Sequence, residues 1–298
     1  MTIQWKRRLA AGLALAVLPL AMTAGSLHFH CEEARAAQVI KEEKGTYGCL
    51  TWPQNLNAVR SEVEIFKEIP KDLRADAPIA TAIYRNTQVY TNSLMLDMRQ
   101  LQAEKPLFYR VRAYDLDGRP IGPYSQPADV ESALFKTERN APIPHDPYGK
   151  GSGSVLLYPV YAYTGNPNAT RYEIEVTSKY PENLHGFSPS VHRIYAAKTE
   201  LTDLYDDAPR TGTYYWRVRG MDSTGKPVGE WSLPQEIKNP VKHWKVAVYG
   251  DSISHGGGHL SFGPADLAYS YESYLDFPSI NLSQSGDTSE AMVMRFEK

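Results

Sequence analysis

Apolar and polar residues alternate with a period of two along several stretches of the chain. Tyr172 to Val176 and Leu94 to Met98 both alternate in this way, and helical spacing is scarce in the same part of the sequence. Short alternating runs are typical of strands that bury one face, as in a β-sandwich. The pattern therefore predicts β structure for the part of the chain up to about residue 240.

One strand-turn-strand pattern occurs twice, because the chain matches itself when it is shifted by 107 residues. Phe108–Ala113 aligns with Tyr215–Gly220 without a gap, and Tyr124 aligns with Trp231. Each copy has an Arg-Val-Arg strand, an Asp-x-x-Gly turn and a Gly-x-aromatic-Ser segment, which predicts a hairpin with one buried face. We therefore predict two copies of one module.

The amino terminus has the parts of a secretory signal. Lys6, Arg7 and Arg8 precede an apolar run from Leu9 to Met22, and Ala34-Arg35-Ala36 offers small residues around a cleavage site. The run has about 14 apolar residues, whereas a membrane-spanning helix needs about 20. We predict that residues 1–36 are a signal peptide. The mature protein is then secreted, extracellular or at the cell surface, with no membrane span after cleavage.

Cleavage after Ala36 leaves 28 basic and 32 acidic residues, a net charge near −4, so no basic surface for nucleic acid is expected. It removes Cys31 and leaves Cys49 alone, which excludes an intrachain disulfide. The candidate metal ligands His28 and His30 leave with the signal. The sequence thus predicts no metal and no cofactor.

Pro, Gly and Ser are concentrated between the two repeats, which predicts a linker. The predicted organisation is a first module at 48–135, a linker at 136–153, a second module at 154–240 and a further segment at 243–298. Asn239-Pro240 is a short join, so we expect the second module to pack close to that segment.

The last segment has a different pattern. Trp244–Tyr249 and Ser279–Ser283 are predicted to be parallel strands, with Asp266–Leu275 as a crossover helix between them. A second helix is predicted to open at Asp287, with Glu290 three residues on in a capping-box arrangement. These elements predict an α/β segment.

A Gly-Asp-Ser turn follows the first of these strands directly. The turn places Ser252 at the carboxyl end of a parallel strand, where open α/β sheets bind ligands. Gly250, Asp251 and Ser252 are also ordinary turn formers, so a plain β-turn is the alternative interpretation. A second block runs from Asn281 to Ser289, and its Gly286 lies 34 residues after the serine. A plain β-turn at residues 250–252 does not explain this second block.

The two blocks resemble those of the SGNH hydrolases, also called the GDSL esterase family. The resemblance implies that Ser252 is a nucleophile, that Gly286 contributes to the oxyanion hole, and that the fold is a flavodoxin-like three-layer α/β/α sandwich. Members of the family also carry an asparagine block and an Asp-x-x-His block, which these 298 residues lack. The segment therefore resembles the front part of such a domain, and we expect the chain as written to be inert.

The two β modules resemble fibronectin type III modules. The resemblance rests on Gly212–Arg219, where Tyr214 takes the place of the tyrosine corner, while the first copy has Leu107 at that position. The predicted fold class is thus multidomain: two all-β fibronectin-III-like sandwiches followed by an incomplete flavodoxin-like α/β segment.

Three local patterns are interpreted without a catalytic role. His255-Gly256-Gly257-Gly258 has the letters of a lipase oxyanion loop but no Gly-x-Ser-x-Gly elbow, so it is predicted to be a flexible loop. His255 and His259 are close to Ser252 in sequence, but a general base must lie within hydrogen-bond distance of the serine hydroxyl. Closeness in sequence does not ensure that distance, so neither histidine is identified as the base. Asp115 and Asp117 could suggest calcium, yet a β-turn explains them, because the second copy has one carboxylate fewer.

The sequence therefore predicts an exported serine ester hydrolase. Its substrates would be acyl or acetyl esters, acylated extracellular carbohydrate among them. The alternative is a non-catalytic adhesion or glycan-binding protein whose hydrolase segment is vestigial.

Overall fold

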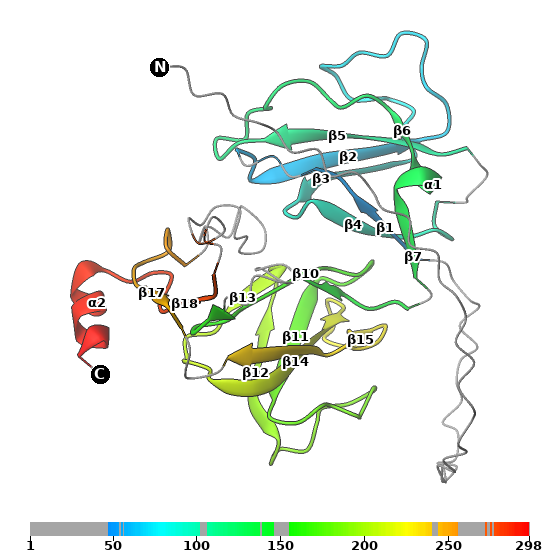
Figure 1. Cartoon of the computed structure of the whole chain (residues 1–298). Coiled ribbons are helices and arrows are strands. Elements are labelled where there is room, and N and C mark those ends of the chain that lie inside the picture. The colour runs from blue at the N-terminus through cyan, green and yellow to red at the C-terminus, as the bar shows by residue number, and fades with distance from the viewer. Residues whose placement is uncertain are drawn as a thin grey trace, which may run out of the picture. The chain divides into compact units, whose positions relative to one another are not determined.

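The computed structural model describes residues 47–53, 55, 57–101, 106–137, 139–145, 155–239, 244–255, 272, 275 and 277–297. Strands dominate these residues (Figure 1). The strands that form the two sandwiches are β1 (Tyr47–Thr51), β2 (Arg60–Phe66), β3 (Tyr84–Val89), β4 (Ser93–Asp97), β5 (Phe108–Tyr114), β6 (Ala128–Asp129), β7 (Leu134–Thr137), β8 (Ile143–Pro144), β10 (Val160–Thr164), β11 (Arg171–Thr177), β12 (Arg193–Thr199), β13 (Asp203–Tyr205), β14 (Gly212–Met221), β15 (Pro227–Val228) and β16 (Gln235–Asn239).

The first sandwich has two antiparallel sheets, with strand orders β4-β1-β7 and β3-β2-β5-β6. A short helix, α1 (Val130–Ala133), follows β6 and is capped by the Asp129 carboxylate. Apolar side chains from both sheets meet in one core, because alternate residues of each strand point to the same face. The buried members of this core are Leu50, Ile65, Leu96, Met98, Leu101, Leu107, Tyr109 and Val130.

The second sandwich repeats this arrangement. Its smaller sheet has the order β13-β10-β8, and its larger sheet has the order β12-β11-β14-β15, with β16 also paired to β14. The core is rich in aromatic residues, and the rings of Tyr161 and Trp216 lie 5.2 Å apart between their centroids. β8 falls inside the stretch predicted as a linker and pairs with β10. Most of the remaining linker, residues 146–153, lies outside the described residues.

The predicted hairpin repeat is confirmed at the level of single hydrogen bonds. Ser125 N donates to Val111 O over 2.8 Å, and Ser232 N donates to Val218 O over 2.7 Å. Gly118 and Gly225 close the two turns with φ of 73° and 83°, a region that glycine enters without steric cost. The two turns thus have the same backbone structure.

Residues 244–297 add three short parallel strands and one helix. β17 (Val246–Val248) pairs with β18 (Ser279–Asn281), and β18 pairs with β9 (Val155–Leu156). The helix α2 (Ser289–Phe296) is capped by Thr288, whose side chain accepts from Ala291 N. The last segment therefore shares a sheet with residues from the start of the predicted second module.

The predicted fold class is wrong, because no flavodoxin-like α/β segment is evident in the described residues. They contain only two helices, of four and eight residues, and α2 has no buried residue. A parallel sheet in a flavodoxin-like domain needs helices packed over both faces. The predicted crossover helix Asp266–Leu275 lies outside the described residues except for Glu272 and Leu275.

The tyrosine corner is also absent from the described residues. Tyr214 is buried in the second core, but its hydroxyl has no hydrogen-bond partner there.

Cys49 is buried and forms no disulfide, and its burial raises the pKa of the thiol to about 11. Neither described helix has the length and apolarity to cross a membrane. The predicted signal peptide, residues 1–36, lies outside the described residues.

Candidate active site

The Gly-Asp-Ser turn lies directly after the parallel strand β17, as the sequence predicts. The Asp251 side chain accepts from Ile253 N over 3.0 Å, and its carbonyl accepts from His255 N over 3.0 Å. These two bonds hold residues 251–255 in a compact turn. Ser252 is half-buried on this turn.

The block that contains Gly286 lies beside this turn. β17 and β18 are parallel neighbours in the sheet. Beyond their carboxyl ends, Gln284 N donates to Gly250 O over 3.2 Å. Gly286 is exposed with φ of 92°, and a Cβ built there would meet no atom within 4 Å. Its backbone angle, rather than lack of space, therefore favours glycine. The structure thus brings together the two segments that carry the predicted site residues.

Arg295 bridges the ends of the two strands. Its guanidinium donates to Leu282 O over 2.5 Å and to Gly250 O over 3.4 Å, and it forms an ion pair of 2.6 Å with Asp287. Both charged side chains are largely shielded from solvent, so the ion pair is little screened. Arg295 therefore fixes the turn against the block that contains Gly286. Sequence analysis gave it no such role.

His255 does not behave as part of a flexible loop. It is 1% exposed, its Nε2 lies 2.7 Å from Tyr158 O, and Ser285 N donates to its Nδ1 over 3.1 Å. Since Nδ1 accepts a hydrogen bond, Nε2 carries the ring hydrogen and donates a hydrogen bond to the Tyr158 carbonyl. Burial lowers the pKa of the ring, so the imidazole is neutral at pH 7. Both ring nitrogens are thus hydrogen-bonded to backbone groups, of Tyr158 and Ser285, and neither is bonded to Ser252.

Two further residues fix the turn. Asn281 is fully buried and donates from its side chain to Ser254 O over 2.6 Å. A Cβ at Gly250 would lie 2.5 Å from Ser254 Oγ, so this close approach requires glycine. Asn281 is thus a structural residue that fixes the turn.

No general base is in place at Ser252 among the described residues. Within the described part of the chain, no side chain forms a hydrogen bond with the Ser252 hydroxyl. His259 lies outside the described residues. Asp115, the suspected calcium ligand, accepts the Arg119 amide in its turn, and no cluster of metal-ligating side chains occurs in the described ranges.

In comparisons with known proteins, no family model matches the chain and no curated protein matches it significantly.

Proposed function

We propose that the chain is an exported serine ester hydrolase in which Ser252 is the nucleophile. The observation that carries the proposal is the backbone pairing that sets the Gly-Asp-Ser turn beside the Gly286 block. The bonds from Arg295 to both segments support it, because they hold the segment of the proposed nucleophile against the segment of the proposed oxyanion donor. The resemblance to the SGNH hydrolases gives the reaction class.

The proposed chemistry is acyl transfer through a covalent intermediate. Ser252 Oγ attacks the ester carbonyl carbon as its proton passes to a base, and the amides of Ser252 and Gly286 donate to the oxyanion. Collapse of the tetrahedral species breaks the bond to the alcohol, which takes up the proton. Water then hydrolyses the acyl-serine and releases the acid.

We assign the base to a group outside the described residues. His255 is excluded because Tyr158 and Ser285 occupy its two nitrogens, and the sequence contains no Asp-x-x-His. By resemblance, the substrates are acyl or acetyl esters, with acylated extracellular carbohydrate as the class that suits an exported protein.

The test is hydrolysis of p-nitrophenyl acetate by the natural gene product at its full encoded length. Ser252→Ala should lower kcat by about 10⁴-fold or more, to the residual rate that binding without a nucleophile allows. Ser254→Ala is the matched control, since it removes a half-buried hydroxyl from the same turn. It should retain most of the activity.

Equal rates for the Ser252→Ala protein and the unchanged protein would exclude Ser252 as the nucleophile. If the natural gene product shows no ester hydrolysis above buffer, with acetylated xylan as a second substrate, the proposal fails. The non-catalytic alternative would then be favoured.

A further inference from the structure

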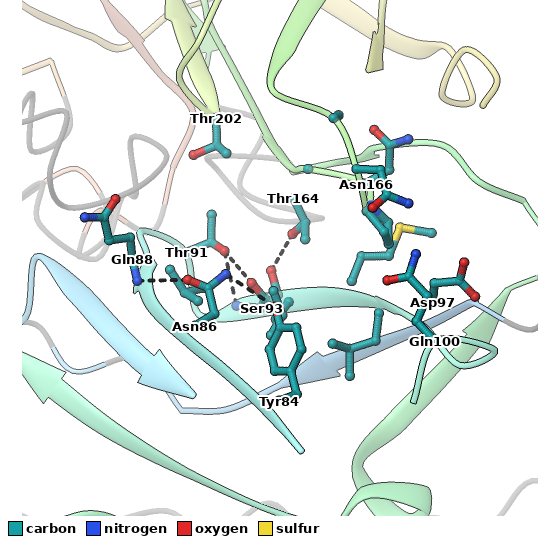
Figure 2. A pocket seen from close by; sticks show the side chains of 18 of the residues that line it. Tyr84, Asn86, Gln88, Thr91, Ser93, Asp97, Gln100, Thr164, Asn166 and Thr202 are labelled. Carbon is teal, nitrogen blue, oxygen red and sulfur yellow. Dashed lines mark hydrogen bonds between the residues drawn. The ribbon is translucent and has the colours of Figure 1, made fainter. Parts of the chain in front are cut away.

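A cavity of about 550 Å³ opens between β3 and β4 of the first sandwich and the β10 end of the second (Figure 2). This volume falls within the range of about 300–1,000 Å³ for small-molecule sites. Figure 2 shows side chains from both sandwiches gathered around it, with Asn86, Thr91 and Ser93 on one side and Thr164 and Thr202 on the other. It lies apart in sequence from the Ser252 turn.

The lining is polar but almost free of charge. Asn86, Gln88, Gln100, Asn166 and Asn168 contribute amides, and no Lys, Arg or His is among the described lining residues. Asp97 is the single carboxylate there, and Arg99 neutralises it through bonds of 3.0 and 2.9 Å. A phosphate or carboxylate ligand would find no cation in this lining, because Arg99 lies outside it. A neutral ligand with many hydroxyl groups suits amides and hydroxyls, which both donate and accept.

Several of these polar groups are held in place by the protein. Asn86 Oδ1 accepts from Gln88 N over 2.9 Å, and Thr91 Oγ1 donates to Ser93 O over 2.5 Å. Ser93 and Thr164, each 3% exposed, share a hydrogen bond between their hydroxyls that joins the two sandwiches. A preorganised lining loses little conformational entropy when a ligand binds.

An exposed apolar surface lies beside these groups. Tyr90 is 39% exposed and Ile83 is 42% exposed, and both line the cavity. A flat aromatic face next to hydrogen-bonding groups suits a sugar ring, which has apolar C–H faces and a polar edge. Asn168, also in the lining, has a positive φ of 66°, a region that asparagine enters more readily than most residues other than glycine.

We propose that this cavity binds a neutral oligosaccharide. The inference does not depend on the ester hydrolase proposal, because no cavity residue belongs to the Ser252 turn or the Gly286 block. If both proposals hold, the cavity retains the protein on a glycan whose esters it cleaves. If only this one holds, the protein is a glycan-binding protein.

The test is isothermal titration calorimetry of the mature full chain with xylohexaose, cellohexaose and mannohexaose as probes. At least one should bind, and hexagalacturonate should not, because its carboxylates would meet no cation. Tyr90→Ala should weaken binding of the active probe about tenfold, and Asn86→Ala should weaken it severalfold. Tyr180→Ala removes a tyrosine of 57% exposure outside the cavity and should leave Kd unchanged.

Ser252→Ala separates this proposal from the previous one, since it should leave Kd unchanged whatever it does to ester hydrolysis. The proposal is overturned if none of the three neutral hexasaccharides binds at millimolar concentration. It is also overturned if Tyr90→Ala and Asn86→Ala bind as the unchanged chain does, because the sugar would then sit elsewhere. Equal binding of hexagalacturonate would contradict the requirement for a neutral ligand.

Discussion

The first arginine of the repeated hairpin has the same surroundings in both sandwiches. Arg110 Nε donates to Glu64 over 2.8 Å, and Arg217 Nε donates to Glu175 over 2.8 Å. Each arginine is 1% exposed and also donates to two backbone carbonyls of a loop that covers the sheet. Each guanidinium also lies over the aromatic residue that follows the turn, Tyr124 or Trp231, at 3.9 and 4.4 Å from the ring centroid.

The second arginine differs between the copies. Arg219 donates twice to Glu173, over 2.9 and 2.7 Å. Arg112 lies opposite Glu62 in the same register, but it donates to the carbonyls of Gly122 and Asp76 instead. Both arginines of the second hairpin therefore pair with glutamates of β11, whereas in the first hairpin only Arg110 pairs with a glutamate of β2.

Neighbouring side chains explain the difference. Glu62 accepts from the Tyr114 hydroxyl and from Arg85, each over 2.5 Å, so its oxygens are occupied. The residue that corresponds to Tyr114 in the second copy is Met221, which cannot donate. Two residues that lie opposite each other in the same strand register thus need not form the same ion pair in both copies, because a third side chain can occupy the carboxylate oxygens.

The largest expected effect comes from breaking the pair that both copies share. Arg217→Met leaves the Glu175 carboxylate buried without its main partner, and Arg110→Met does the same to Glu64. Each should lower the free energy of unfolding by about 3–5 kcal/mol. Urea unfolding of the mature chain, followed by circular dichroism, measures this. Arg119→Met, in an ion pair whose side chains are 75% and 65% exposed, is the control and should cost less than about 1 kcal/mol. A similarly small cost for Arg217→Met would contradict the prediction.

The next largest effect concerns how stability depends on pH. A buried carboxylate on each of the two smaller sheets changes stability with pH, and the two changes have opposite signs. Burial raises the pKa of Asp203, on β13, to about 7. Between about pH 4 and pH 7 the folded state therefore holds a proton that the unfolded state has lost, so stability falls as pH rises through this window. Asp203→Asn should flatten this decline and stabilise the mature chain at pH 7.5 by on the order of 2–4 kcal/mol.

Asp97 lies on β4, which has the same place in the smaller sheet of the first sandwich as β13 has in the second. The Arg99 guanidinium lowers its pKa, so its contribution is present at neutral pH and is lost as pH falls through the lowered value. Asp97→Asn should thus destabilise the chain at pH 7.5. Glu272, whose pKa burial also raises to about 7, leaves a residual slope in the Asp203→Asn protein. An unchanged slope between pH 4 and pH 7 would contradict the assignment to Asp203.

The hairpins could be predicted because their information is local. The spacing of Asp, Gly and Ser specifies the turns, and the same is true of the turn that follows β17. The alternation of Arg-Val-Arg predicts that only the face with the valine is buried. This prediction was incomplete. The arginine face is buried as well, since loop carbonyls 31 to 36 residues away cover Arg110 and Arg217.

The surroundings of the candidate site could not be predicted for the same reason. His255 is fixed by Tyr158, 97 residues earlier, and the third parallel strand comes from Val155–Leu156. Neither segment has a pattern that connects it with the Gly-Asp-Ser turn. The resemblance to a flavodoxin-like domain suggested helices over this sheet, whereas the described residues extend it with β9, a strand from the start of the predicted second module.

A smaller effect is expected from the difference between the second arginines. Arg219→Met removes both bonds to Glu173, which keeps Lys198 at 3.0 Å, so the cost should be about 1.5–3 kcal/mol. Arg112→Met removes only bonds to carbonyls and should cost about 1 kcal/mol or less. Urea unfolding of the two proteins measures the difference. Equal costs would mean that the extra ion pair of the second sandwich has no energetic weight.

A double-mutant cycle with Tyr114→Phe tests the cause of that difference. Loss of the Tyr114 hydroxyl frees one oxygen of Glu62, and Arg112 lies directly opposite it in the sheet register. In the Tyr114→Phe background, Arg112→Met should therefore cost about 0.5–1 kcal/mol more than it does alone. Phenylalanine keeps the ring under the Arg60 guanidinium, which lies 4.0 Å from its centroid, so the change isolates the hydroxyl. A coupling energy near zero would show that Arg85 alone, and not Tyr114, keeps Glu62 from Arg112.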